Sequence, residues 1–198
     1  FGAVRSKAID GLQHQMESCF AMKWILAMVA LGILGLAIAF AVRVGAFKDV
    51  TIEVSEQGPY KVVSHEHTGA YHLIAPVILD VEKWAKANGE SCRFSFGEFL
   101  DDPKVVDEDR LKSSGGCVVE KDWSTGLPSG HVYREISRRT YLVAKFDGAP
   151  GIGPMKVYPR AMRAIEERGK KLEGPVIEMY EVLPGDQVIT TYLFPIQP

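Results

Sequence analysis

The longest apolar stretch in the chain lies near its N-terminus. From Trp24 to Val42, 19 consecutive residues carry no charge, and Lys23 and Arg43 bound the stretch. A helix of this length spans about 28 Å, close to the hydrocarbon thickness of a bilayer. A helix in a soluble core rarely runs this long without a polar face. We therefore expect a single transmembrane helix over residues 24–43, preceded by an N-terminal segment, residues 1–23.

A cleaved signal peptide is the alternative interpretation of the same stretch. Ala39-Phe40-Ala41 fits a small-x-small cleavage site, but the apolar part of a signal peptide usually spans only about 7–15 residues. Basic residues flank both ends, so the positive-inside rule leaves the side of the soluble part undetermined. Because the sequence begins with Phe1, Met16 and Met22 are candidate translation starts.

Beyond residue 47 the pattern changes to short strands and amphipathic helices. Val50–Ser55 and Tyr60–His67 have strand composition and flank a Gly58-Pro59 turn. Apolar residues then recur at spacings of three and four, which predicts a helix ending near Gly89. Its stripe consists of Leu73, Ile74, Val77, Ile78, Val81, Trp84 and Ala85. Strands containing Phe94, Phe96 and Val118 follow.

The second half shows the same order of elements. Tyr141–Phe146 reads as a strand, and a hairpin of Val176–Leu183 and Val188–Pro195 closes the chain. Between them lies a second predicted helix, whose apolar stripe consists of Met155, Tyr158, Met162 and Ile165.

Marker residues of the two halves recur at a nearly constant offset. Gly69 and Gly148, and likewise Phe99 and Tyr180, are separated by 79 and 81 positions. We expect an α+β domain over residues 48–198, built from two pseudo-symmetric strand–helix–strand–strand repeats at about 50–122 and 131–197. The repeats would form one antiparallel sheet with two helices on one face, and a ligand cleft would follow their seam.

Charge and cysteine content limit the classes of partner and the covalent links that we expect. The 198 residues carry a formal net charge of −2 without a basic run, which argues against nucleic acid as a partner. Cys92 and Cys117 lie in the domain without a framework spacing, and we expect buried thiols, with one disulfide as the alternative.

The domain resembles the GyrI-like small-molecule-binding family over residues 48–197. The resemblance rests on His67-Thr68-Gly69-Ala70-Tyr71 before the first helix and on Glu178-Met179-Tyr180-Glu181 near the end. Leu100-Asp101-Asp102-Pro103 and Val157-Tyr158-Pro159 support it. Within the family, the chain is most similar to the membrane-anchored branch that includes a testis-expressed ER-phagy receptor.

The resemblance implies a groove lined by aromatic side chains. If Leu183 pairs with Val188 in the last hairpin, Ile177 and Met179 face the helices and four residues of the hairpin share the groove face. With contributions from the first repeat, the expected ligand-binding residues are Tyr71, Phe99, Glu178, Tyr180, Thr191 and Leu193.

One position departs from the family pattern. Where many members carry an acidic residue in the last strand, this chain has Thr191, whose hydroxyl is neither a general base nor a counter-charge. This argues against catalysis and against cation binding, although Glu178 is a candidate substitute. We expect no enzyme activity, and hydrolysis through Glu178 is the least favoured hypothesis.

The remaining polar motifs have structural interpretations. His65, His67 and His72 lack an obvious further ligand, so we expect no metal site and no cofactor. Asp101-Asp102-Pro103 is ordinary turn chemistry. Trp123, in a Gly-, Pro- and Ser-rich connection, either caps the cleft as part of the site or merely covers it.

The leading hypothesis is a single-pass membrane protein that tethers a module binding a small amphipathic or aromatic ligand. Its partners would be the lipid bilayer and that ligand. The alternative is a membrane-anchored scaffold whose surface recruits a protein partner.

Overall fold

The computed structural model describes residues 2–185 and 187–197, with the side chains of the first helix described from residue 22 onward. The chain divides into two compact units, Phe1–Phe47 and Lys48–Pro198. The first unit consists of one helix, α1 (Gly2–Arg43), whose part from Met22 to Arg43 is long and apolar enough to cross a membrane. Its apolar side chains are exposed, among them Leu36 at 74%.

The second unit is an α+β domain. Its strands are β1 (Val50–Gln57), β2 (Tyr60–Thr68), β3 (Phe94–Phe99), β4 (Lys112–Val118), β5 (His131–Ile136), β6 (Arg139–Asp147), β7 (Val176–Leu183) and β8 (Gln187–Pro195). Its helices are α2 (Ala75–Ala87) and α3 (Gly153–Glu167), with the short 3-10 turns η1 (Tyr71–Leu73) and η2 (Glu108–Arg110). The elements predicted from the sequence are therefore present, with bounds that differ by a few residues.

All eight strands belong to one antiparallel sheet, in the order β1-β6-β8-β7-β3-β4-β2-β5. This order is unchanged when β1 to β4 are exchanged with β5 to β8, because β3 and β7 pair at the centre. Each half also lends its first strand to the other, since β1 pairs with β6 and β5 pairs with β2. The order is the one that a duplicated unit would give, and the duplication itself stays a prediction.

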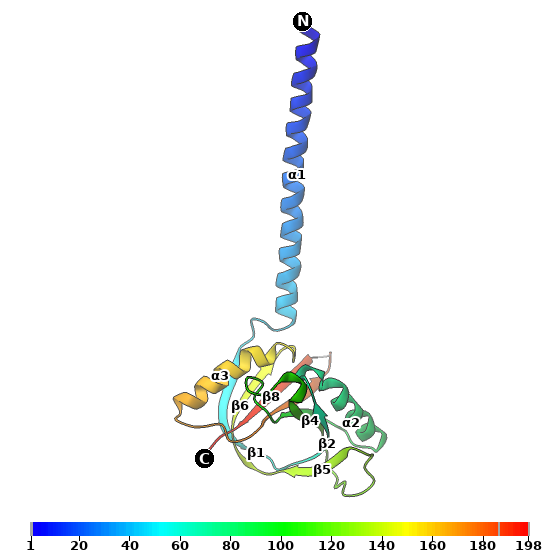
Figure 1. Ribbon diagram of the computed structural model, residues 1–198, viewed down its shortest axis with the longest axis vertical. Helices are drawn as coiled ribbons and strands as arrows, with labels where there is room; N and C mark the ends of the chain where they lie inside the picture. Colours follow the sequence, from blue (N-terminus) through cyan, green and yellow to red (C-terminus); the bar gives the residue numbers. More distant parts are fainter. Residues whose placement is uncertain (1, 186, 198) are drawn as a thin grey trace. The chain divides into compact units, whose positions relative to one another are not determined.

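Both helices of the domain cover the same face of the sheet (Figure 1). Gly97 of β3 pairs with Glu178 of β7, and the side chains of directly paired residues share a face. Ile74, at the start of α2, lies over Gly97, and Tyr158 of α3 hydrogen-bonds Glu178. The central pair of strands therefore lies beneath the seam between the helices.

Apolar side chains fill both faces of the sheet. Under α3 the core contains Leu142, Phe146, Val157, Ala161, Tyr192 and Phe194, and under α2 it contains Val63, Val81, Ala85, Cys117 and Val119. The opposite face carries a third cluster of Val62, Phe96, Ile136, Tyr141, Val143, Ile177, Met179 and Leu193. Beside it the β1–β2 and β5–β6 turns meet, where Nε of Arg138 donates to the Gly58 carbonyl at 3.1 Å.

The stripe predicted for the second helix was partly wrong. Ile165 is buried, but Met155 and Met162 are 71% and 44% exposed. The other buried positions are Gly153, Val157, Ala161 and Ala164, three of them small, so α3 packs closely on the sheet. The expectation of free thiols was also wrong: Cys92 and Cys117 form a disulfide, with Cα atoms 5.3 Å apart.

Candidate functional site

A buried carboxyl group lies at the centre of the domain. The Glu178 side chain comes from the middle of β7, faces the helices, and the residue is 3% exposed. Its Oε1 accepts a hydrogen bond from the Tyr158 hydroxyl at 3.0 Å, and its Oε2 accepts one from the Tyr180 hydroxyl at 3.0 Å. A buried carboxyl group is costly unless it is hydrogen-bonded, and two tyrosines meet that need here.

The two tyrosines are held by different elements. Tyr180 lies two residues after Glu178 on β7, so strand alternation puts both side chains on one face. Tyr158 comes from α3, where its ring packs edge-on against Tyr192 at 6.0 Å and Phe194 at 5.2 Å between ring centroids. Both hydroxyls are thereby directed at the same carboxyl group.

The first half of the domain contributes two aromatic rings. Tyr71 of η1 and Phe99 at the end of β3 pack edge-to-face with ring centroids 4.8 Å apart. The Tyr71 hydroxyl donates to the Asp101 carbonyl at 2.8 Å and accepts from the Asp101 amide, which fixes η1 to the β3–β4 loop. We call Tyr71, Phe99, Tyr158, Glu178 and Tyr180 the interhelical seam.

On the β3 side, the residue paired with Glu178 is Gly97, which has no side chain. A Cβ on Gly97 would lie 3.1 Å from Cζ of Phe99 and 3.5 Å from Cδ1 of Ile74. The Phe99 ring and Ile74 therefore occupy the space over Gly97. Shallow hollows in the described residues lie instead beside η1, one of them lined by Tyr71, His72, Pro103, Glu108 and Leu111.

Burial dominates the electrostatics of the seam. Desolvation raises the pKa of Glu178 to about 7, although the hydrogen bonds from Tyr158 and Tyr180 act in the opposite direction. Desolvation, together with the neighbouring Glu178, also raises the pKa of both tyrosines well above its ordinary value. The tyrosines remain donors at neutral pH, and the carboxyl group changes its charge near neutrality.

Two of the predicted site residues are not part of the seam. The last hairpin pairs Leu183 with Gln187, one residue away from the predicted register, so Glu178 lies opposite Tyr192 and Tyr180 opposite Thr190. A one-residue slip moves a whole strand to the other face. Thr191 and Leu193 therefore lie on the face away from the helices, where they pair with Met179 and Ile177. The prediction that Ile177 and Met179 face the helices was also wrong, because α3 covers the Glu178 face of β7 and these two residues pack in the cluster on the opposite face.

Sequence reasoning missed Tyr158 as a member of the seam. It was assigned to the apolar stripe of its helix, and its hydroxyl was left without a role. A signal was present, because a buried tyrosine hydroxyl needs a hydrogen-bond partner, and the strand beneath it carries a carboxyl group.

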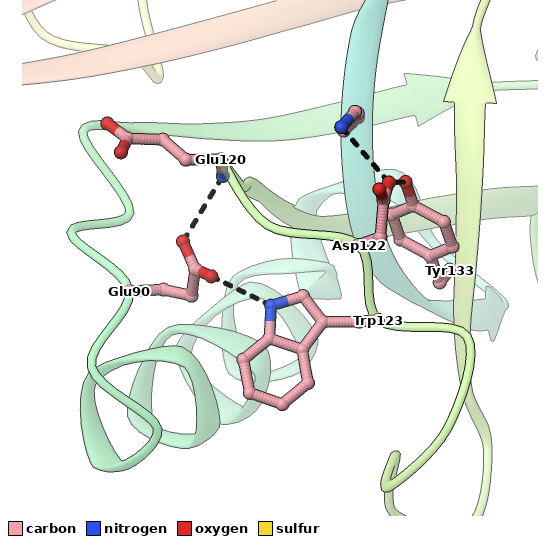
Figure 2. Close-up of polar contacts among 6 residues, drawn as sticks. Glu90, Glu120, Asp122, Trp123 and Tyr133 are labelled. Carbon is pink, nitrogen blue, oxygen red and sulfur yellow. Dashed lines mark hydrogen bonds and ion pairs between the residues drawn. The ribbon is translucent and has the colours of Figure 1, made fainter.

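Trp123 packs with α2 and not in the interhelical seam. Its Nε1 donates to Oε1 of Glu90 at 2.8 Å, and Oε2 of Glu90 accepts from the Glu120 amide at 3.2 Å (Figure 2). Its ring meets Trp84 of α2 edge-on, with centroids 4.8 Å apart. Both interpretations put Trp123 over the cleft, whereas the structure places it against Trp84 and Glu90.

The motifs interpreted as structural behave as turns and loop contacts. Asp101 Oδ2 accepts from the Lys112 amide at 2.7 Å, and Asp102 Oδ1 accepts from the Lys104 amide at 2.9 Å. His67 and His72 do not meet: Nε2 of His67 lies 3.3 Å from the Ala70 carbonyl, and Nδ1 of His72 lies 3.7 Å from Glu108.

Several solved protein structures have a fold similar to that of this chain. The C-terminal domain of EcmrR is 16% identical, with a TM-score of 0.60 over 75% of this chain and 98% of that one. EcmrR in a DNA complex is 14% identical, with a TM-score of 0.59 over 85% of this chain and 68% of that one. SAV2435 bound to tetraphenylphosphonium is 9% identical, with a TM-score of 0.52 over 74% of this chain and 94% of that one. At these identities the likeness shows the fold.

The sequence itself gives the family. A search of curated protein sequences found no significant match. The sequence model of the GyrI-like small molecule binding domain, in contrast, matches residues 51–197, which is nearly the whole of the second unit. The chain therefore belongs to the GyrI-like small-molecule-binding domain family.

Proposed function

We propose that this protein binds an aromatic, amphipathic cation in the interhelical seam, as a membrane-tethered binding module without catalytic activity. The observation that carries the proposal is Glu178, a buried carboxyl group held by the hydroxyls of Tyr158 and Tyr180. An aromatic cation placed there would gain from ring contacts and from the carboxylate charge.

The charge of Glu178 supports a cation over a neutral ligand. With a pKa of about 7, the carboxyl group ionises at little cost near neutral pH, and a cation would favour the ionised form. This restores the cationic ligand that Thr191 argued against, because Glu178 supplies the counter-charge. The similar structure of SAV2435 is bound to tetraphenylphosphonium, an aromatic cation, which makes that ion a suitable probe.

A ligand with several aromatic rings, such as tetraphenylphosphonium, can reach Glu178 only if the seam opens. Phe99 and Ile74 fill the space over Gly97, so they must move before a ring can reach Glu178. The adjoining turn η1 has no buried residue, so moving it breaks the two Tyr71–Asp101 hydrogen bonds but exposes little buried surface. We infer that opening takes place at Tyr71–Leu73.

The tether is the apolar part of α1. Its 22 residues from Met22 to Arg43 suffice to cross a bilayer, and their apolar side chains are exposed. Insertion would remove that surface from water, which is the physical reason for proposing a membrane anchor and a membrane localisation.

A paired ligand measurement tests the proposal. Full-length protein in non-ionic detergent is titrated with tetraphenylphosphonium and with neutral triphenylphosphine oxide, followed by calorimetry. Glu178→Gln should weaken the cation at least about tenfold, or about 1.4 kcal/mol, and leave the neutral compound within about threefold. The affinity of the wild type for the cation should rise as the pH rises through about 7, because the carboxyl group must ionise.

Glu181→Gln is the matched control. Glu181 lies on the same strand but points to the opposite face, where it pairs with Arg93 at 3.0 Å at the surface. Its replacement should leave both affinities unchanged. Equal effects of the two substitutions, or an unchanged affinity of Glu178→Gln for the cation, would contradict a ligand contact at Glu178.

Phe99 and Ile74 fill the space over Gly97, and this favours one second candidate function. In that function the protein is a scaffold, and the residues of the seam only pack the core. This function corresponds to the membrane-anchored branch that the sequence resembles, and a protein would bind elsewhere on the domain. Tyr180→Ala separates the two. A ligand site predicts lost affinity with a modest change in melting temperature, whereas the scaffold predicts a sharply lower melting temperature and no binding in wild type or variant.

A further inference from the structure

A second cluster of polar side chains lies away from the interhelical seam, at the β5 edge of the sheet. His65 of β2, His131 of β5 and Asp80 of α2 each offer a ligand atom, and these atoms all lie within 4.8 Å of one another. Three elements that are distant in sequence thus bring together two imidazoles and a carboxylate.

The fold explains why these residues meet. His65 and His131 are directly paired across β2 and β5, with ring centroids 5.3 Å apart. His65 shares its face with Val63, which packs in the core under α2. Asp80 projects from α2 near them, and Trp84, one helical turn later, packs 5.9 Å from the His131 ring.

The burial of the His131 side chain is not explained by its contacts within the described residues. Its side chain is only 4% exposed, and neither ring nitrogen has a hydrogen-bond partner among the residues that the structure describes. Asp80 lies 3.8 Å from Nε2, too far for a hydrogen bond, and Asp80 itself is 62% exposed. A buried imidazole with two unsatisfied nitrogens costs free energy, and coordination of an ion would satisfy one of them.

The His65 ring lies directly against the backbone of Gly130. Gly130 has a positive φ of 84°, and a Cβ there would lie 2.7 Å from Nε2 of His65. Glycine at this position therefore lets the His65 ring lie against the start of β5, next to His131.

We propose that His65, Asp80 and His131 bind a divalent transition-metal ion, with Zn²⁺ as the best fit. Two imidazoles and one carboxylate with a fourth position open to solvent are a common zinc set. Ligand atoms around a tetrahedral zinc ion lie about 3.4 Å apart, whereas the three ligand atoms here lie within 4.8 Å of one another. Shifts of about 1 Å would therefore bring them to the separation that zinc requires. Asp80, being exposed on a helix, makes most of that shift by a change of rotamer. Of the three histidines considered in the sequence, the site takes His65 but neither His67 nor His72, and it shares no residue with the interhelical seam.

Zinc titration of the full-length protein in detergent tests the site. His14→Ala and Cys19→Ser are introduced first, because these N-terminal residues offer ligands outside the proposed set. Calorimetry should show one Zn²⁺ per chain, and Co²⁺ should give the visible absorption of a four-coordinate ion. Asp80→Ala and His131→Gln should each lower the affinity for Zn²⁺ at least about tenfold, a loss seen even when only a neighbour of a ligand is removed.

The controls are Glu82→Ala, another carboxylate on α2, and His72→Gln, another histidine of the same domain. Both should bind Zn²⁺ as the parent does. Asp80→Ala keeps the test decisive if His131→Gln does not fold, because Asp80 is exposed. The proposal is overturned by a parent protein without saturable Zn²⁺ binding, or by an affinity that Asp80→Ala leaves unchanged.

Discussion

At the scale of single residues, the buried carboxyl group of Glu178 is the main feature of the candidate site. Burial disfavours its charged form, whereas the hydroxyls of Tyr158 and Tyr180 favour it. Burial is the stronger effect, and the pKa of about 7 follows from that balance. The same group therefore links proton binding to stability and, in the proposed function, to ligand charge.

Stability should depend on pH through this group. Its pKa rises from 4.5 to about 7 on folding, so between these values the folded protein binds more protons than the unfolded chain. The stabilisation is complete below the unfolded pKa and is lost as the pH rises through the folded one. Relative to Glu178→Gln, the wild type should lose about 2–3 kcal/mol of unfolding free energy between about pH 5 and pH 8.

Urea unfolding of both proteins, followed by near-ultraviolet circular dichroism, measures this difference. Parallel pH profiles of wild type and Glu178→Gln would show that the carboxyl group is not buried in the folded protein.

At the scale of elements, close packing of α3 on the sheet decides which residues are buried. The helix begins at Gly153, where a Cβ would lie 1.9 Å from the Tyr192 hydroxyl. Tyr192 is fully buried and has no room to retreat. Small residues on this side of α3 bring Tyr158 close enough to the sheet to reach Glu178.

Gly153→Ala should therefore destabilise the domain by about 1–3 kcal/mol, the usual cost of overpacking a core. Gly151→Ala is the matched control, because a Cβ at Gly151 meets nothing within 4 Å. Tyr192→Phe removes the clashing oxygen, so the double variant should lose less than the two single variants combined. Urea unfolding midpoints are compared for the wild type and the four variants, and equal midpoints for Gly153→Ala and Gly151→Ala would rule out the close approach.

At the scale of the whole molecule, the division into two compact units predicts that the domain folds without α1 and that α1 holds the chain in the membrane. A fragment that begins at Lys48 keeps the whole sheet and both of its helices, so it should be soluble and folded. The full chain should remain with membranes after alkaline carbonate extraction, because the apolar segment of α1 holds it there. Fractionation with amino-terminal sequencing and circular dichroism checks both outcomes.

Two results would contradict this division. Aggregation of the fragment would show that the domain needs residues before Lys48. Recovery of the chain in the soluble fraction with an amino terminus after Ala41 would establish a cleaved signal peptide instead of an anchor.

The sequence by itself determined the local features of this protein. The uncharged run from Trp24 to Val42 predicts the apolar helix, because a helix without a polar face has few other environments. Spacings of two and of three to four residues predict the order of strands and helices. Glu178, Tyr180, Tyr71 and Phe99 were selected through the family resemblance, and their role in ligand binding stays a prediction. The structure places Glu178 and Tyr180 on the face under the helices, opposite to the face expected for the groove.

Only the tertiary structure decided register, face and long-range pairing. One residue in the last hairpin moved Thr191 and Leu193 to the other side of the sheet, since side chains alternate along a strand. The exchange of β1 and β5 between the halves, the disulfide of Cys92 with Cys117, and the meeting of His65 with His131 depend on contacts far apart in sequence. Local patterns predict which elements form, but the partner of each element is set by the packing of the complete core.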